Sequence, residues 1–200
     1  MPLALLLAAS PRHGGTSDTL ARLFAEGAEE GGLACRFLAL RDVRIRPCRG
    51  CGQCAAPPHG CPLSGGGSGD GADGVFAAIR DAALVLWAAP IYFYGLPAHA
   101  KGLLDRAQRF WHGPAATVPR PAIAGLVAGR PRGEHLFTGA ELGLRYFFPL
   151  LGRHLEETRR WRGMEDASDW RQRDGNRPRA EEVRQWGRQW AQRLSGTASL

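Results

Sequence analysis

Short apolar runs alternate along the chain with longer segments in which apolar residues recur every three to four positions. The runs at residues 2–9 and 83–92 are apolar almost throughout, which is typical of strands buried on both faces. Residues 34–43 and 121–128 give two further strands, and the more polar segment 155–164 predicts a weak fifth. Strands that alternate with helices indicate a parallel sheet.

The intervening segments predict the helices. Apolar residues fall on one face of residues 16–30, where Gly31 and Gly32 end the helix. Four more helices are expected, at 75–82, 97–111, 139–154 and 180–194. Pro149 limits or kinks the fourth helix, and residues 166–179 are expected to form a polar loop.

These units predict a fold of the α/β class, a flavodoxin-like three-layer sandwich with a five-stranded parallel sheet of order 2-1-3-4-5. We expect one domain over residues 1–200, with a cysteine-containing and Gly-rich loop at 47–74. Ligands of such sheets bind beyond the carboxyl ends of the first and third strands, which are expected here at residues 2–9 and 83–92. The loops at 9–19 and 89–96 are therefore the candidate site.

Composition and charge exclude several classes of function. Although the net charge is +7, the 12 arginines between residues 145 and 200 are interleaved with 8 acidic residues, so no nucleic-acid partner is expected. No apolar run is long enough to cross a membrane. The apolar start lacks the basic region and cleavage site of a signal peptide, so we expect a cytoplasmic protein.

The first loop reads ASPRHGGTSDTL and has the residue types of a phosphate site. Ser10, Thr16 and Ser17 supply hydroxyls, Arg12 supplies a guanidinium, and the start of the next helix adds its positive dipole. No GxxxxGK[ST] or GxGxxG pattern is present, which argues against an NTPase or a dinucleotide-binding Rossmann domain. The alternative is an ordinary helix cap and turn.

The second loop reads APIYFYGLP and places aromatic rings beside the phosphate site. Pro90 ends the strand, the aromatic residues at 92–94 (Tyr92, Phe93 and Tyr94) offer flat faces, and Gly95 permits close approach or an unusual φ. This combination fits flavin mononucleotide (FMN). The alternative is that the aromatic residues pack in the core, as they do in most proteins.

Three segments resemble the flavodoxin-like NAD(P)H-dependent FMN reductase family, and especially its iron–sulfur flavoprotein branch: SPRHGGTSDTL, APIYFYGLPAHAKGLLDR and LRDVRIRPCRGCGQC. The resemblance implies an FMN-binding oxidoreductase, a homodimer or homotetramer, that takes hydride from NADH or NADPH and reduces a small-molecule or protein acceptor. By position, the phosphate would lie on Ser10, Arg12, Thr16 and Ser17. The isoalloxazine would lie on Pro90, Ile91, Tyr92, Phe93 and Gly95.

Four cysteines follow the second predicted strand with the spacing C-x2-C-x2-C-x6-C and a proline after the last: Cys48, Cys51, Cys54 and Cys61. This compact run resembles ferredoxin motifs and predicts a [4Fe–4S] cluster as one alternative. Empty thiols or a disulfide are the other. Zinc is disfavoured, because zinc sites usually separate two pairs of ligands by a longer spacer.

The leading hypothesis is an FMN-dependent NAD(P)H oxidoreductase without a side-chain nucleophile, since the chain has no GxSxG motif and its histidines lack metal-ligand spacing. No catalytic side chain is predicted. The alternatives are a flavodoxin-type electron carrier with no direct NAD(P)H oxidation, and a binding module of the same fold whose site is empty.

Overall fold

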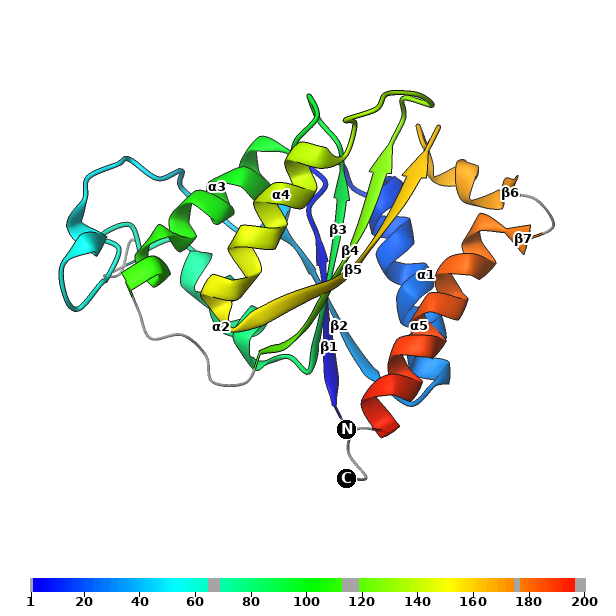
Figure 1. Cartoon of the computed structure of the whole chain (residues 1–200), viewed down its shortest axis with the longest axis horizontal. Coiled ribbons are helices and arrows are strands. Elements are labelled where there is room, and N and C mark those ends of the chain that lie inside the picture. The colour runs from blue at the N-terminus through cyan, green and yellow to red at the C-terminus, as the bar shows by residue number, and fades with distance from the viewer. Residues whose placement is uncertain (1, 65–68, 113–118, 175–176, 197–200) are drawn as a thin grey trace.

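The computed structural model describes residues 2–64, 69–112, 119–174 and 177–196. It contains a five-stranded parallel sheet of order β2-β1-β3-β4-β5 with helices on both faces, as the sequence predicts (Figure 1). The strands are β1 (Leu3–Ala8), β2 (Ala34–Ala39), β3 (Leu84–Pro90), β4 (Arg120–Ala128) and β5 (Arg153–Arg162). The helices are α1 (Thr16–Glu30), α2 (Ala72–Asp81), α3 (Ala98–Arg106), α4 (Thr138–Phe147) and α5 (Arg179–Gly196).

Alternate residues of the central strands supply two separate cores. Leu5 and Leu7 of β1 point to the face covered by α2, α3 and α4, and Leu6 points to the face covered by α1 and α5. The helices lie on these two sides in Figure 1. The central strands β1 and β3 are therefore buried on both faces, which explains their nearly continuous apolar sequence.

The register aligns the carboxyl ends of the strands. Ala8 at the end of β1 pairs with Ala39 of β2 and Ala88 of β3, and Pro90 pairs with Val127 of β4. The loops that follow β1, β2, β3 and β4 consequently leave the sheet at one edge. This is the edge where ligands of such folds bind.

The prediction of a polar loop at residues 166–179 is wrong in part. It contains a 3₁₀ helix (Ala167–Arg171) and a short antiparallel pair, β6 (Arg173–Asp174) and β7 (Arg177–Pro178). Trp170 is only 2% exposed and packs edge-on against Trp161 of β5. Burial of this one indole orders a segment whose composition is otherwise that of a loop.

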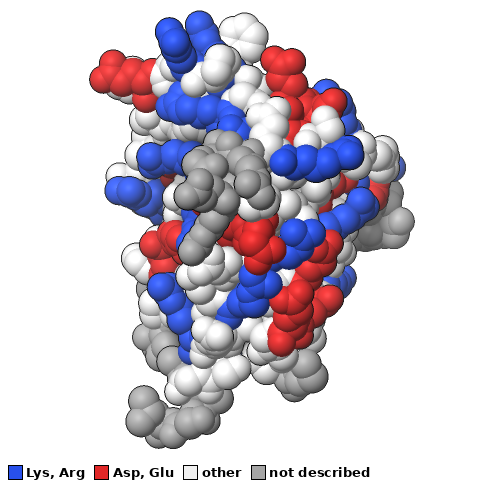
Figure 2. Space-filling model, turned by 90° about the vertical axis from the view of Figure 1, so that its right-hand side faces the viewer, with Lys and Arg blue, Asp and Glu red and all other residues white. Residues whose placement is uncertain are grey.

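Helices α1 and α5 cross in close contact through two glycines. A Cβ at Gly187 would overlap the carbonyl oxygen of Phe24, and a Cβ at Gly27 would overlap that of Arg184. Ion pairs join the same helices at their exposed rims, Arg184 with Glu26 at 2.6 Å and Arg188 with Glu30 at 2.7 Å. The surface on this side of the molecule carries both signs of charge (Figure 2).

Substitution of Gly187 by alanine is expected to lower the free energy of unfolding by about 1–3 kcal/mol, because the added methyl group forces two backbones apart. Urea denaturation measures the change. Gly74→Ala is the matched control, since a Cβ at that exposed helical position meets nothing within 4 Å. That change is expected to stabilise the protein by up to about 1 kcal/mol. Equal effects of the two substitutions would contradict the close contact.

Glu157 of β5 binds two tryptophans of α5. One carboxylate oxygen accepts the indole N–H groups of Trp186 at 2.7 Å and Trp190 at 3.1 Å, and the other accepts Nε–H of Arg159 at 2.7 Å. Burial by itself would raise the pKa of Glu157. The hydrogen bonds from Arg159 and the two indoles outweigh it and hold the pKa below its ordinary value.

The Glu157 contacts make stability depend on pH. Because the pKa is lowered in the folded state, the contribution is fully present above the unfolded pKa of about 4.3 and is lost as pH falls through the folded pKa. Glu157→Gln is expected to cost about 1 kcal/mol at pH 7, less as the pH falls below 4.3, and to shift tryptophan fluorescence. Equal costs at pH 7 and at acid pH would refute this. Exposed Glu156 is the control position.

Among the described residues, no helix is both long and apolar enough to cross a membrane.

Candidate functional site

The loop after β1 presents the start of α1 without a side-chain cap. Gly15 is the N-cap residue, and none of its neighbours caps the helix by a side-chain hydrogen bond. The first helical bond runs from the N–H of Thr19 to Gly15 O, so the N–H groups of residues 16–18 have no acceptor in the helix. Ser17 is fully buried, and its Oγ has no partner among the residues described. Such a helix start favours an anion.

The four residues predicted to hold a phosphate come together at this helix start. Ser10 is 3% exposed, and its Oγ accepts the backbone N–H of Arg12 at 3.1 Å, which fixes the turn. Thr16 and Ser17 are buried in the first turn of α1, and Arg12 is exposed beside them. The set therefore combines hydroxyls and a cation around free N–H groups, a chemistry that fits a phosphate.

Sequence reasoning missed an ion pair inside this loop. Asp18 is completely buried, and Arg41, in the 3₁₀ turn (Leu40–Asp42) after β2, binds its carboxylate with two nitrogens at 2.9 and 2.8 Å. The position of Arg41 was the available signal, because the end of the second strand lies beside the end of the first in a 2-1-3-4-5 sheet.

A second missed residue supports the loop from behind. The indole N–H of Trp170 donates to the carbonyl oxygen of Thr16 at 3.0 Å, in a buried hydrogen bond between residues far apart in the sequence. This contact holds the first turn of α1 against the segment that follows β5. The loop after β1 therefore depends on a residue 154 positions later in the sequence.

The loop after β3 forms a tight hairpin with strained aromatic residues at its tip. Tyr92 and Gly95 exchange two backbone hydrogen bonds, 3.0 and 2.9 Å long. Phe93 and Tyr94 between them have φ values of +48° and +62°, the geometry of a type I′ turn. Gly95 would permit an unusual φ, but the positive φ values lie at the two aromatic residues before it. Left-handed backbone at non-glycine residues is typical of functional sites.

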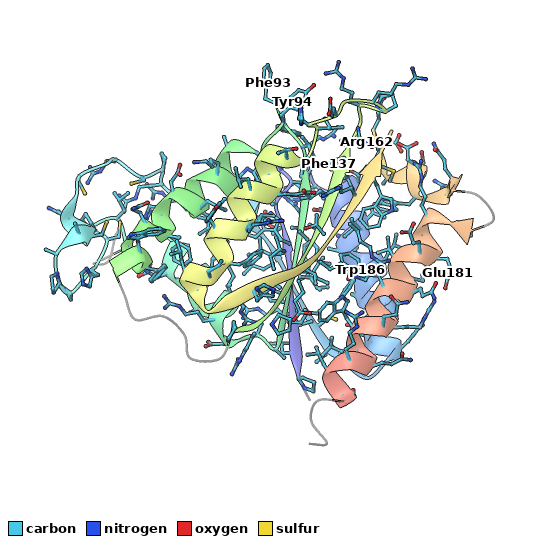
Figure 3. All side chains as sticks on the ribbon, in the orientation of Figure 1. Phe93, Tyr94, Phe137, Arg162, Glu181 and Trp186 are labelled. Atoms are coloured by element: carbon cyan, nitrogen blue, oxygen red, sulfur yellow. The ribbon has the colours of Figure 1, made fainter. Side chains whose placement is uncertain are left out.

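A hollow of about 280 Å³ opens beside this hairpin, lined by Ile91, Phe93, Tyr94, Arg130 and Leu136. Arg130, in the loop after β4, donates to the Tyr94 hydroxyl at 3.0 Å. Figure 3 shows Phe93 and Tyr94 at the top of the sheet. The walls of the hollow are aromatic and aliphatic, with one cation, and they suit a flat ring.

Only part of the predicted ring-binding set lines this hollow. Ile91 and Phe93 do, whereas Pro90, Tyr92 and Gly95 belong to the same strand end and hairpin without lining it. The structure adds three lining residues that the predicted ring-binding set did not contain: Tyr94, Arg130 and Leu136.

The cysteine segment forms a separate loop at one end of α3 (Figure 1). All four predicted cysteines line one hollow of about 240 Å³, together with Arg49, Arg106 and Arg109 among others. No group of three or more His, Cys, Asp or Glu side chains in the described ranges is arranged to hold a metal ion. The thiols thus share one cavity without forming a ready-made ligand shell. Cys35 stands apart on β2, where burial raises the pKa of its thiol to about 11.

Arg106 of α3 connects the two arms of the cysteine loop. Its side chain is 1% exposed and binds both carboxylate oxygens of Asp70, at 2.5 and 3.2 Å. It also donates to the carbonyl oxygen of Arg46 at 2.9 Å and to Ser64 Oγ at 2.6 Å, so that both arms of the loop are attached to α3. Burial alone would raise the pKa of Asp70, but hydrogen bonds from Arg106 and from backbone N–H groups keep it below its ordinary value.

The fold and the two loops define a flavodoxin-like α/β protein in which the uncapped start of α1 and the aromatic hairpin lie at the same edge of the sheet. The model of the NADPH-dependent FMN reductase family matches residues 2–140, so the chain belongs to that family of FMN-binding oxidoreductases.

Two iron–sulfur flavoproteins are similar to part of the chain. The protein MJ1083 of Methanocaldococcus jannaschii is 29% identical over 102 residues, which are 51% of this chain and 50% of that protein. The protein of Methanosarcina thermophila is 28% identical over 101 residues, 50% of each chain. The chain therefore spans about half the length of the curated relatives it matches.

Solved structures share the fold over nearly the whole chain. An NAD(P)H:quinone oxidoreductase from Methanothermobacter marburgensis has a TM-score of 0.60 at 19% identity, covering 96% of this chain and 98% of that one. An archaeal flavodoxin has a TM-score of 0.55 at 10% identity, covering 96% and 99%. These likenesses confirm the flavodoxin-like fold.

Proposed function

We propose that this protein binds FMN and acts as an oxidoreductase that takes reducing equivalents from NADH or NADPH and delivers them to a small-molecule or protein acceptor. The observation that carries the proposal is the uncapped start of α1, with the unpartnered Oγ of buried Ser17, on the same sheet edge as the aromatic hairpin. An anion site and a flat-ring site side by side match the two ends of FMN.

Each part of the site has a distinct task in this proposal. Ser10, Thr16, Ser17 and the free N–H groups of α1 would hold the phosphate, and Arg12 would add charge. Ile91, Phe93 and Tyr94 would contact the ring, with Arg130 as the cation of the hollow. Bound FMN supplies the hydride and electron chemistry. The residues lining the hollow include no carboxylate or imidazole, so the protein contributes binding and orientation rather than a strong acid or base.

Flavin titration tests the FMN site. Arg12→Gln is expected to weaken FMN about 10–100-fold, because a charge-assisted contact is lost, and to leave riboflavin binding unchanged. Arg22→Gln, an exposed arginine farther along α1, is the matched control. Wild-type protein that binds FMN no better than riboflavin would overturn the phosphate site, and protein that binds neither would overturn the function.

Rapid mixing of the FMN-loaded protein with NADH and with NADPH tests the enzyme activity. Direct loss of flavin absorbance with either nucleotide supports the proposal. Reduction only in the presence of a partner reductase would instead indicate a flavodoxin-type carrier. Assembly into a homodimer or homotetramer is part of the proposal and is measured by light scattering.

We further propose that Cys48, Cys51, Cys54 and Cys61 are the ligands of a [4Fe–4S] cluster. Support comes from the hollow that all four cysteines line and from their compact C-x2-C-x2-C-x6-C spacing. Iron and sulfide analysis of anaerobically purified protein decides the question. Absence of both would leave four empty thiols and remove the proposal. Cys35→Ser, outside the loop, is the control for Cys51→Ser.

A further inference from the structure

A buried acid lies within the loop proposed to bind a phosphate. Asp18 is the third residue of α1 and is 0% exposed. One of its oxygens accepts the backbone N–H of Gly14 at 2.9 Å, so the carboxylate is built into the turn. A second anion nearby would be repelled by this charge if nothing opposed it. A phosphate site at this helix start therefore requires that Asp18 be neutralised.

Arg41 supplies the opposite charge and also joins the two sides of the loop. Its two terminal nitrogens bind both oxygens of Asp18, and one of them also donates to the carbonyl oxygen of Ser10 at 3.3 Å. Its Nε–H donates to Nδ1 of His13 at 3.0 Å. The guanidinium thus contacts residues before and after the glycine turn. The side chain of Arg41 is only 10% exposed, so solvent screens the pair weakly.

We infer that Arg41 is a positioning residue for anion binding: it cancels the charge of Asp18 and holds the loop in the shape that accepts a phosphate. The inference rests on the proposed FMN function. It goes beyond that function by assigning a role to a residue outside the first loop, in the 3₁₀ turn after β2. Arg41 acts through Asp18 and the loop carbonyl.

The inference predicts a specific dependence on the phosphate group. Arg41→Gln leaves a buried carboxylate with no cation to oppose it, directly beside the ligand's own charge. FMN binding is expected to weaken about 100-fold or more, whereas riboflavin, which lacks the phosphate, is expected to change less than about threefold. Asp18→Asn in the same chain removes the unopposed charge and is expected to restore most of the FMN affinity.

Titration of FMN and riboflavin into wild type, Arg41→Gln, Asp18→Asn and the double variant forms the test. Arg36→Gln, an exposed arginine on β2, is the control for loss of one positive charge. A loss shared equally by FMN and riboflavin would mean that Arg41 has only a structural role. Failure of Asp18→Asn to rescue binding would exclude the charge argument. The double variant serves also if Arg41→Gln alone does not fold.

Failure of the proposed function is distinguishable from failure of this inference. If wild type binds FMN more tightly than riboflavin but the double variant shows no rescue, only the inference is wrong. If wild type binds neither flavin, inorganic phosphate is the probe. A phosphate-dependent rise in melting temperature in wild type, absent in Arg41→Gln and regained in the double variant, supports the inference. The same rise in all variants overturns it.

Discussion

Replacing Arg106 with methionine is expected to lower the free energy of unfolding by about 3–5 kcal/mol, because buried Asp70 loses the cation that binds both of its oxygens and, of the cations in the described ranges, keeps only Arg46, whose Nε lies 3.8 Å away. Both arms of the cysteine loop also lose their attachment to α3, so its thiols should react faster with an alkylating reagent. Urea denaturation and timed alkylation of Cys48 and Cys61 followed by mass spectrometry measure the two effects.

Two further variants make this result interpretable. Lys101→Met removes the exposed pair with Asp105 on the same helix and is expected to cost about 0.5 kcal/mol or less. Adding Asp70→Asn to Arg106→Met removes the buried charge and should recover part of the lost stability. If the Arg106 and Lys101 variants were equally stable, the buried contacts of Arg106 would make no special contribution to the free energy of unfolding.

Changing Phe93-Tyr94 to Asn-Gly is expected to stabilise the fold and to damage the flavin site. Asn-Gly is the preferred pair of a type I′ turn, and removing the positive φ from two aromatic residues should recover about 1–2 kcal/mol. The same change removes two walls of the hollow. We expect FMN and riboflavin to bind about 10–100-fold more weakly, because aromatic stacking on a flat ring is worth about 1–3 kcal/mol.

Thermal denaturation of the protein without ligand measures the gain in stability, and flavin titration measures the loss of affinity. Tyr146→Gln, which removes an exposed aromatic side chain from α4, should change neither quantity by much. A hairpin variant that gained stability and kept its flavin affinity would show that the strained turn has no part in binding.

The sheet was predictable from sequence because its signals are local. The all-apolar runs of β1 and β3 gave both their position and their burial on two faces, and Gly31 marked the end of α1. The segment around Trp170 was not predictable in the same way. A single tryptophan among charged residues has no periodicity, and its burial depends on contacts with β5 and α1 that are distant in sequence.

The candidate site, too, was predictable only where its signals are local in the sequence. Residue types in two loops were enough to predict a phosphate site and a ring site there, and the structure brings the two loops to one edge of the sheet. The ion pairs were beyond that reasoning, since Asp18 and Arg41 are 23 positions apart and Asp70 and Arg106 are 36 apart. The positive φ at Phe93 was also hidden, because local preference assigns that backbone to Gly95. Cysteine spacing left a cluster and empty thiols open, and the common hollow of the four thiols is visible only in the structure.

The hydrogen bond from Trp170 to Thr16 bears on the order of events during synthesis. The loop after β1 leaves the ribosome early, but Trp170, which supports it, is added only about 150 residues later. Folding of the N-terminal part during translation would therefore leave the loop without this support until Trp170 has emerged from the ribosome. We expect a nascent chain to hold FMN only after that point.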